Sequence, residues 1–258
     1  AGSITDGFGS IDIGTDLIKS GSLEVGNVKV GTDTIGHGAD IDLITLAKQT
    51  AEAGTDGFMV GGSTDLSLEN VDLAVETIKQ TTHMPVILFP THASSVSGKA
   101  DAIFFMSLLN SESRQFLVGE QIASAPWVKK TGLEPLSMAY LVVAPGMTAG
   151  RVGQAQPLPR DQPDLVVSHA LAGQYLGMKY IYLEAGSGAS DPVPEDIIKS
   201  VRESIDVTLI VGGGIRTPES ARKVVAAGAD IVVTGTFVET SQSLKEEMTA
   251  LTNAIHSK

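Results

Sequence analysis

The segment T-L-I-V-G-G-G-I-R-T-P-E, from Thr208 to Glu219, holds the change from strand to helix that decides the fold class. Four residues suited to a buried strand run directly into three glycines. Thr217 then supplies an N-cap, and Pro218 and Glu219 are favourable in the first turn of a helix. The segment is therefore expected to form one strand, a tight glycine turn and the start of a helix.

Units of the same kind follow one another along most of the chain. Val71, Ala74, Val75 and Ile78, for example, keep the spacing of one buried helix face. Strands alternate with such helices, which predicts a parallel α/β fold. The strands expected from this pattern are 57–60, 85–89, 102–108, 138–144, 180–183, 208–211 and 230–234. The helices expected between and around them are 41–53, one containing 71–78, 114–130, 165–176, 195–204, 218–227 and one from about 243.

Seven strands need an eighth to close a barrel, and Val25–Val30 is the best candidate in the first 40 residues. The segment A-G-T-D-G-F-M-V-G at Ala53–Gly61 resembles A-G-A-D-I-V-V-T-G at Ala227–Gly235. This faint internal repeat favours a barrel of repeated helix–strand units over an open sheet. We therefore predict a modified (β/α)8 TIM barrel forming a single domain over 1–258, with 1–38 as an atypical N-terminal segment. The alternative is a doubly wound open sheet, although no G-x-G-x-x-G follows the first strand.

The composition narrows the class of partner. A formal charge of −12 over 258 residues argues against nucleic acid, whose binding rests on clustered Lys and Arg. With no cysteine and no signal-peptide pattern, we expect a cytoplasmic protein without disulfides or thiolate sites. No apolar run approaches the roughly 20 residues needed to span a bilayer, but 42 % hydrophobic residues leave room for peripheral membrane contact.

Three glycine-bearing turns follow the last three expected strands. They are Y-L-E-A-G-S-G at Tyr182–Gly188, V-G-G-G-I-R at Val211–Arg216 and T-G-T at Thr234–Thr236. Glycine lets the backbone approach a ligand closely, and free N–H groups at a helix start attract anions. In barrels the loops after strands seven and eight commonly bind phosphate together. We therefore predict phosphate-binding loops after the last three strands.

Other strand ends carry candidate catalytic and metal-binding groups. Glu184 should project into the mouth of the barrel, either as a rim carboxylate in a salt bridge or as a base for a substrate hydroxyl. Tyr182 should share its face, because side chains alternate along a strand. The hydroxyl of Ser63 suits either a helix N-cap or Mg²⁺. The long connection from Pro145 to Pro163 is expected to act as a lid or substrate wall.

Several long motifs in fixed order resemble the geranylgeranylglyceryl phosphate synthase family, in its longer archaeal-type branch, over about residues 41–245. They are G-F-M-V-G-G-S-T, P-V-I-L-F-P, F-F-M-S-L-L-N-S, A-Y-L-V-V-A-P-G-M-T-A-G-R-V-G, Y-L-E-A-G-S-G-A, V-G-G-G-I-R and A-D-I-V-V-T-G-T.

The resemblance implies a Mg²⁺-dependent prenyltransferase of ether-lipid biosynthesis. Such an enzyme joins geranylgeranyl diphosphate, a polyprenyl diphosphate, to the hydroxyl of sn-glycerol 1-phosphate. It implies Glu184 as the catalytic residue and, by analogy, a homo-oligomer. Glycerol phosphate would be bound by Tyr182, Leu183, Glu184, Ala185, Gly186, Ser187, Gly188, Gly213, Gly214, Gly235 and Thr236.

The resemblance also implies a metal site made by Ser63 and an aspartate that ends the first strand. The family's usual Asp-Pro segment is missing here, and Asp33, which lies 30 residues before Ser63, is nominated from its spacing. Two alternatives stay open because this fold hosts many chemistries. One is a phosphate-binding isomerase or lyase, and the other is a non-catalytic phosphate-binding barrel without the metal aspartate.

Overall fold

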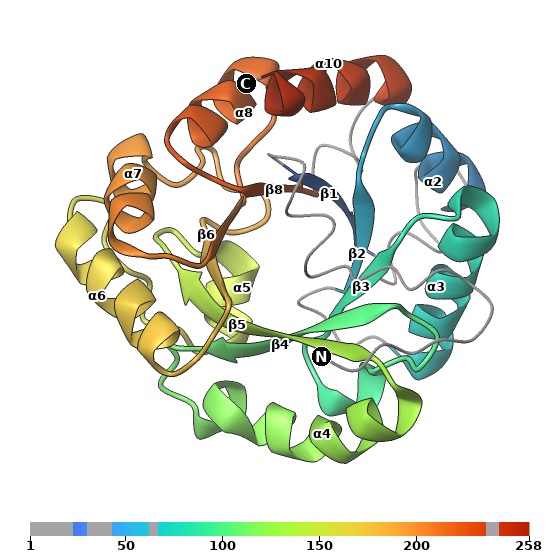
Figure 1. Ribbon diagram of the computed structural model, residues 1–258, viewed down its shortest axis with the longest axis horizontal. Helices are drawn as coiled ribbons and strands as arrows, with labels where there is room; N and C mark the ends of the chain where they lie inside the picture. Colours follow the sequence, from blue (N-terminus) through green and yellow to red (C-terminus); the bar gives the residue numbers. More distant parts are fainter. Residues whose placement is uncertain (1–22, 30–42, 62–66, 236–242, 258) are drawn as a thin grey trace.

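Eight parallel strands form a closed barrel in the computed structural model, which describes residues 23–29, 43–61, 67–235 and 243–257 (Figure 1). Neighbours along the chain are neighbours in the barrel, and β1 pairs with both β2 and β8. The predicted TIM barrel is confirmed, and an open sheet is excluded. The strands are β1 (Leu23–Lys29), β2 (Gly57–Gly61), β3 (Val86–Phe89), β4 (Ala102–Leu108), β5 (Glu134–Val142), β6 (Tyr180–Glu184), β7 (Thr208–Gly212) and β8 (Ile231–Thr234).

The eighth strand lies where the sequence placed it. β1 aligns Val25 with Gly57 of β2 and with Val233 of β8, so it closes the ring between the first and last units. The rest of the atypical segment 1–38 falls outside the described residues.

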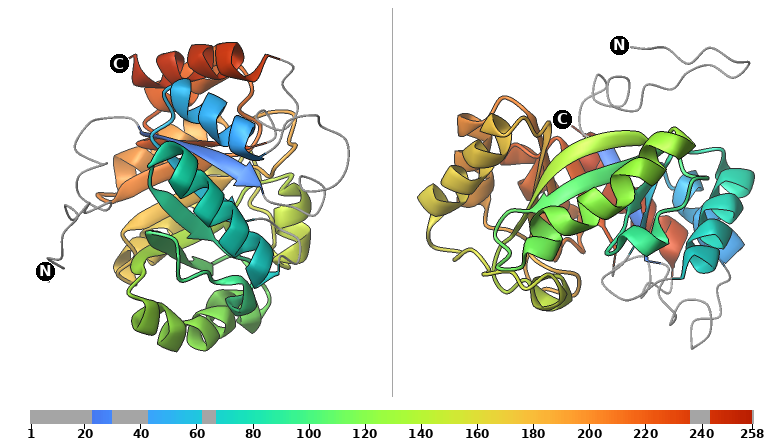
Figure 2. Two further views of the ribbon diagram at one scale, coloured as in Figure 1. Left: turned by 90° about the vertical axis from the view of Figure 1, so that its right-hand side faces the viewer. Right: turned by 90° about the horizontal axis from the view of Figure 1, so that it is seen from below.

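Helices surround the barrel on its outer side (Figures 1 and 2). The α8 cap forms as expected, because the Thr217 hydroxyl accepts from the Ser220 N–H while the Ser220 hydroxyl accepts from the Thr217 N–H. α10 packs against α8 and α2 and so joins the two ends of the helical ring. The α-helices are α2 (Leu43–Glu52), α3 (Leu68–Thr82), α4 (Glu120–Thr131), α5 (Met147–Val152), α6 (Pro163–Tyr175), α7 (Glu195–Ser204), α8 (Pro218–Ala226) and α10 (Leu244–His256).

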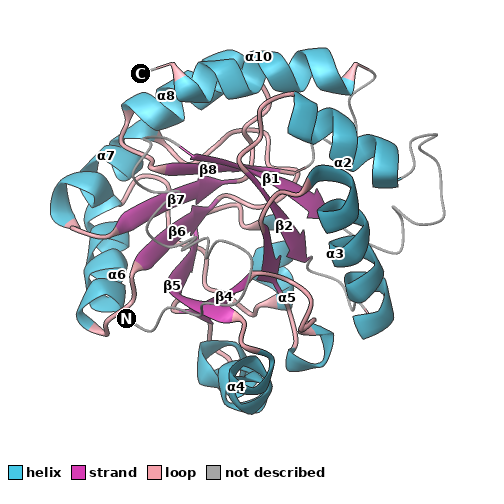
Figure 3. Ribbon diagram, turned by 45° about the vertical axis from the view of Figure 1, so that its right-hand side comes forward, coloured by secondary structure: helices cyan, strands magenta, loops and turns pink. Residues whose placement is uncertain are grey.

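The connection between β3 and β4 departs from a regular barrel. Residues 90–101 contain a short 3-10 helix, Ala93–Ser95, and no α-helix (Figure 3). Trp127 of α4 reaches across this connection, and its indole N–H donates to the Val96 carbonyl at 2.9 Å. The barrel is therefore modified between β3 and β4, where a 3-10 helix takes the place of the α-helix that follows a strand in a regular barrel.

Strand residues alternate between two cores. On β6, Tyr180 and Tyr182 point into the barrel, while Ile181 and Leu183 pack outward against the helices. Because alternate residues share a face, Glu184 continues the inward row at the carboxyl end of its strand. The Glu184 carboxylate therefore lies at the open end of the barrel, next to the inward-pointing tyrosines of β6.

Two segments differ from the sequence prediction in the helices that they contain. The connection after Pro145 contains α5, a short helix that was concealed by its length, by Gly150 within it and by the flanking Gly146 and Gly153. The helix predicted at 114–130 begins with a π-helical turn, Gln115–Gly119, before α4. No helix among the described residues is long and apolar enough to cross a membrane.

Candidate active site

A polar pocket lies at the carboxyl ends of β6, β7 and β8. All three predicted glycine turns contribute to it, through Glu184 and Ser187, Gly213 and Gly214, and Gly235. The full lining is Tyr182, Glu184, Ser187, Gly213, Gly214, Ile215, Arg216, Val233, Thr234 and Gly235. The three turns therefore do meet. Arg216, an exposed cation on the rim, was not nominated from the sequence.

Glycine is required where the β7 turn packs against the β6 turn. Gly213 and Gly214 have φ values of +82° and +73°, which side chains rarely adopt. A Cβ on Gly213 would overlap the Glu184 carboxylate, and one on Gly214 would overlap the Asp191 backbone, 2.7 Å from the Pro192 nitrogen. Only glycine therefore fits at both positions, and the two turns pack closely backbone to backbone.

Glu184 is an enclosed carboxylate with an exposed fraction of 8 %. Its Oε1 accepts from the Gly186 N–H at 2.6 Å, and it also accepts hydrogen bonds from the hydroxyls of Tyr140 and Tyr182. Burial, and then the charge of Glu184, raise the pKa of each tyrosine well above its usual value. Both phenols therefore stay protonated and keep donating to the carboxylate.

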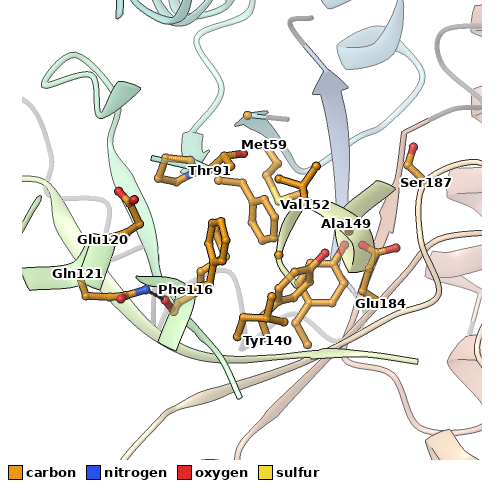
Figure 4. A pocket seen from close by; sticks show the side chains of 17 residues that line it. Met59, Thr91, Phe116, Glu120, Gln121, Tyr140, Ala149, Val152, Glu184 and Ser187 are labelled. Atoms are coloured by element: carbon orange, nitrogen blue, oxygen red, sulfur yellow. Dashed lines mark hydrogen bonds between the residues drawn. The ribbon is translucent and has the colours of Figure 1, made fainter. Parts of the chain in front are cut away.

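An apolar pocket lies on the other side of Glu184. Figure 4 shows Glu184 and Ser187 at one end of this pocket and Glu120 and Gln121 at the other, with Phe116 between them. It is lined by Met59, Gly61, Phe89, Pro90, Thr91, Met106, Leu108, Phe116, Glu120, Gln121, Tyr140, Ala149, Val152, Gly153, Tyr182, Glu184 and Ser187. The two pockets share Tyr182, Glu184 and Ser187. A polar site and an apolar site therefore meet at one carboxylate.

Glu120, the second carboxylate in the apolar pocket, has a structural role. Glu120 accepts from Gln115 Nε2 at 2.6 Å and from the Ala93 N–H at 2.7 Å, and it contacts His92 Nδ1 at 3.1 Å. Burial alone would raise the pKa of Glu120, but these partners outweigh burial and lower it. Glu120 is therefore an ionised anchor for the β3–β4 connection and lies at the opposite end of the pocket from Glu184.

Asn110 and Ser111 fix the wall that contains α5. The Asn110 amide donates to the carbonyls of Val142 and Gln156 at 2.9 and 2.7 Å and accepts from the Val142 N–H. The Ser111 hydroxyl donates to the Gly153 carbonyl at 2.6 Å. The predicted substrate wall after β5 is thus held against β4 by two buried side chains.

The other nominated residues fall into three groups. Leu183 and Ala185 are fully buried, with Leu183 in the outer core, so a ligand would meet their backbone. Gly186 and Gly188 adopt positive φ in the turn below Glu184. Ser63, Asp33 and Thr236 lie outside the described residues. Within the described residues, no three His, Cys, Asp or Glu side chains form a group able to hold a metal ion.

Sequence reasoning did not assign roles to Phe89 and Tyr140, although both lie in motifs that carried the resemblance. The Tyr140 ring is 5.2 Å from the Tyr182 ring and 5.2 Å from the Phe89 ring. Tyr140 is also the register partner of Tyr182, so alternation along β5 and β6 is a signal that could have placed it in the barrel.

Comparison with known proteins shows relatives along most of the chain. Residues 41–255 match the model of the PcrB family. The chain is 54 % identical over 201 residues to a geranylgeranylglyceryl phosphate synthase of Pyrococcus horikoshii, covering 78 % of this chain and 79 % of the relative. It is 46 % identical over 249 residues to one of Methanothrix thermoacetophila, covering 91 % and 98 %.

A solved structure is similar over nearly the whole chain. It is the (S)-3-O-geranylgeranylglyceryl phosphate synthase from Thermoplasma acidophilum in complex with its substrate sn-glycerol-1-phosphate, with a TM-score of 0.86 and 41 % identity. The similarity covers 93 % of this chain and 96 % of that one. With its barrel, its glycine turns and its relatives in agreement, this chain belongs to the geranylgeranylglyceryl phosphate synthase family, within the PcrB family.

Proposed function

We propose that this protein transfers a geranylgeranyl group from geranylgeranyl diphosphate to the 3-hydroxyl of sn-glycerol 1-phosphate. The observation that carries the proposal is the meeting of a glycine-built polar pocket and an apolar pocket at Glu184. One substrate is a small polar phosphate and the other has a long hydrocarbon tail, so each matches one pocket. Family membership supports the same pairing of substrates.

The phosphate of the acceptor binds in the turns around Gly213, Gly214 and Gly235, and its glycerol hydroxyls reach toward Glu184. Backbone N–H groups in such turns favour an anion even in a protein of net charge −12. The hydrocarbon tail lies in the apolar pocket, where burying its surface contributes about 25 cal/mol per Å². The two reacting ends then face each other beside Tyr182, Glu184 and Ser187.

The reaction replaces one carbon–oxygen bond with another. The bond between the allylic carbon and the diphosphate breaks, and its electron pair leaves with the diphosphate oxygen. The glycerol 3-hydroxyl oxygen bonds to the allylic carbon, and its proton passes to Glu184. The carboxylate is suited to this role because three donors hold it in place while it stays at the seam of the two pockets.

An isomerase of a phosphorylated sugar is less compatible with this site. It would need a paired acid and base around one substrate, but Glu120 and Glu184 stand at opposite ends of the pocket (Figure 4). It would also have no use for a largely apolar wall.

Magnesium dependence is part of the proposal and rests on the chemistry of the leaving group. When bound, Mg²⁺ would neutralise the diphosphate and ease its departure. Ser63 and Asp33 are its proposed ligands, and hydroxyl and carboxylate oxygens suit this ion. Ser63→Ala and Asp33→Ala should each raise the Mg²⁺ concentration needed for half-maximal activity, whereas unchanged Mg²⁺ dependence in both would overturn this ligand pair.

The direct test is an assay of the purified protein with geranylgeranyl diphosphate and sn-glycerol 1-phosphate, with Mg²⁺ or with EDTA. The proposal expects geranylgeranylglyceryl phosphate and free diphosphate with Mg²⁺ and neither with EDTA. Glycerol phosphate binding without turnover would instead favour a non-catalytic barrel. Failure to bind glycerol phosphate at all would overturn the assignment of the polar pocket.

A further inference from the structure

Three aromatic rings form a wall where the apolar pocket reaches Glu184. The Phe89 ring lies 5.2 Å from the Tyr140 ring and 5.8 Å from the Tyr182 ring, and all three line the pocket. Tyr140 and Tyr182 are almost completely buried, at 6 % and 1 % exposure, whereas Phe89 is partly exposed. Phe89 is therefore the most exposed of the three residues that form this wall.

Phe89 cannot easily move away from this place. It ends β3, and Gly61 at the end of β2 passes so close that a Cβ there would overlap the Phe89 carbonyl. The Phe104 ring lies 6.1 Å from it on the side of the barrel floor. The ring is thus supported by Phe104, Tyr140 and Tyr182, and it lines the apolar pocket beside the seam, the region of Tyr182, Glu184 and Ser187 where the two pockets join.

This position matters because the proposed reaction creates positive charge at the seam. As the diphosphate leaves, charge develops on the allylic carbon, which must lie next to the hydroxyl oxygen served by Glu184. The face of an aromatic ring attracts a cation, and the attraction is stronger where water is excluded. Since both tyrosines stay protonated, no phenolate is present to take over this role.

We propose that Phe89 is a further catalytic residue, whose ring stabilises the positive charge on the allylic carbon while the diphosphate departs. The inference rests on the proposed prenyl transfer and deepens it. Phe89 forms and breaks no bond. The electron pair leaves with the diphosphate, the new bond forms to the glycerol oxygen, and the proton goes to Glu184.

The rival explanation is that Phe89 only fills space in an apolar wall. Fluorination separates the two, because fluorine atoms weaken the negative potential of a ring face while nearly preserving its size and apolar character. Mono-, di- and trifluorinated phenylalanine would be placed at position 89 in the full chain. The matched control is the same series at Phe104, which is buried beside Phe89 but does not line the pocket.

The measured quantity is the single-turnover rate of prenyl ether formation, with both substrates and Mg²⁺ saturating, so that product release does not mask the chemical step. We expect the rate to fall stepwise with each fluorine at position 89, by about tenfold in total. The series at position 104 should stay nearly flat. Melting temperatures should be alike in both series.

A flat series at position 89 in an active protein would overturn the role of Phe89 and leave the proposed function intact. Equal losses at both positions would overturn it as well, because they would reflect general packing. Absence of product from the unsubstituted protein, a separate result, would overturn the proposed function and this role with it.

Discussion

Glu184→Gln removes the charge of the proposed base while keeping its shape. The Gly186 N–H can only donate, so the amide oxygen of the new side chain must take its place opposite that group, where Oε1 now lies. The amide NH₂ would then face Tyr140 and Tyr182, whose hydroxyl oxygens are able to accept. The substitution is therefore accommodated by turning two hydroxyl hydrogens, without moving the backbone.

The two expected effects differ greatly in size. Exchanging hydrogen bonds to a charged group for neutral ones should lower the free energy of unfolding by about 1 kcal/mol. Losing a general base should lower the chemical rate by roughly 10²- to 10⁴-fold, which equals about 3–5 kcal/mol of transition-state stabilisation. The protein should thus remain folded and bind glycerol phosphate while turning over far more slowly.

The assay pairs single-turnover kinetics with chemical denaturation and with calorimetric titration of sn-glycerol 1-phosphate. Glu195→Gln is the matched control, because Glu195 is an exposed residue in the first turn of α7. It should leave rate and binding unchanged and lower the free energy of unfolding by less than about 1 kcal/mol, because one charge is lost from the first turn of a helix. A loss of less than about tenfold in Glu184→Gln would refute the role of Glu184 as base.

Other regions of the site give three further predictions. Gly214→Ala should lower the free energy of unfolding by ~2–5 kcal/mol and abolish glycerol phosphate binding, because φ is +73° and the Cβ would overlap the Asp191 backbone. Denaturation and calorimetry test this, and near-normal affinity would contradict it. Ala149→Phe should fill the apolar pocket and raise KM for the C20 diphosphate by about tenfold, with KM for glycerol phosphate unchanged. Equal rises in both constants would argue against separate pockets. The pKa values of Tyr140 and Tyr182 are raised in the folded protein, so the unfolded chain loses these protons at lower pH. The contribution of the two tyrosines to the free energy of unfolding is therefore fully present below pH 10 and decreases above it. The expected slope is about 1.4 kcal/mol per pH unit for each tyrosine. Denaturation between pH 9 and 11 should show a shallower fall for Tyr140→Phe, and an unchanged slope would contradict the burial effect.

The sequence predicts the barrel well wherever one local signal is enough. β4 and α7 have the predicted bounds, Ala102–Leu108 and Glu195–Ser204, because apolar spacing and flanking residues agree there. β5 begins at Glu134, four residues before the predicted start, because Glu134 and Pro135 carry no apolar signal. Their pairing with Ala102 and Ile103 of β4 makes them part of the strand. Tertiary contacts decide such boundaries.

In the site, too, residues set by local sequence were predictable and residues set by tertiary contacts were not. Gly213 and Gly214 were predictable because a glycine turn and the following helix cap lie within a few consecutive residues. The apolar pocket was not, because Phe89, Phe116 and Val152 come from β3, the π-helical turn and α5, and only the closed barrel brings them together. Local turns therefore predict the polar pocket, whereas long-range packing builds the apolar one.

Glu184 lies where the polar pocket, built by local turns, meets the apolar pocket, built by long-range packing. A carboxylate in this position needs hydrogen-bond donors, because the apolar side offers it none. An anion beside an apolar wall would ordinarily lose free energy or take up a proton. Here two phenols that stay protonated and one backbone N–H supply the hydrogen bonds that water would otherwise give. The glycine at 213 makes room for the carboxylate from the other side, since a Cβ there would overlap Oε1. These partners and the packing at Gly213 thus hold Glu184 where the polar and apolar pockets meet, beside the hydroxyl from which it is proposed to take a proton.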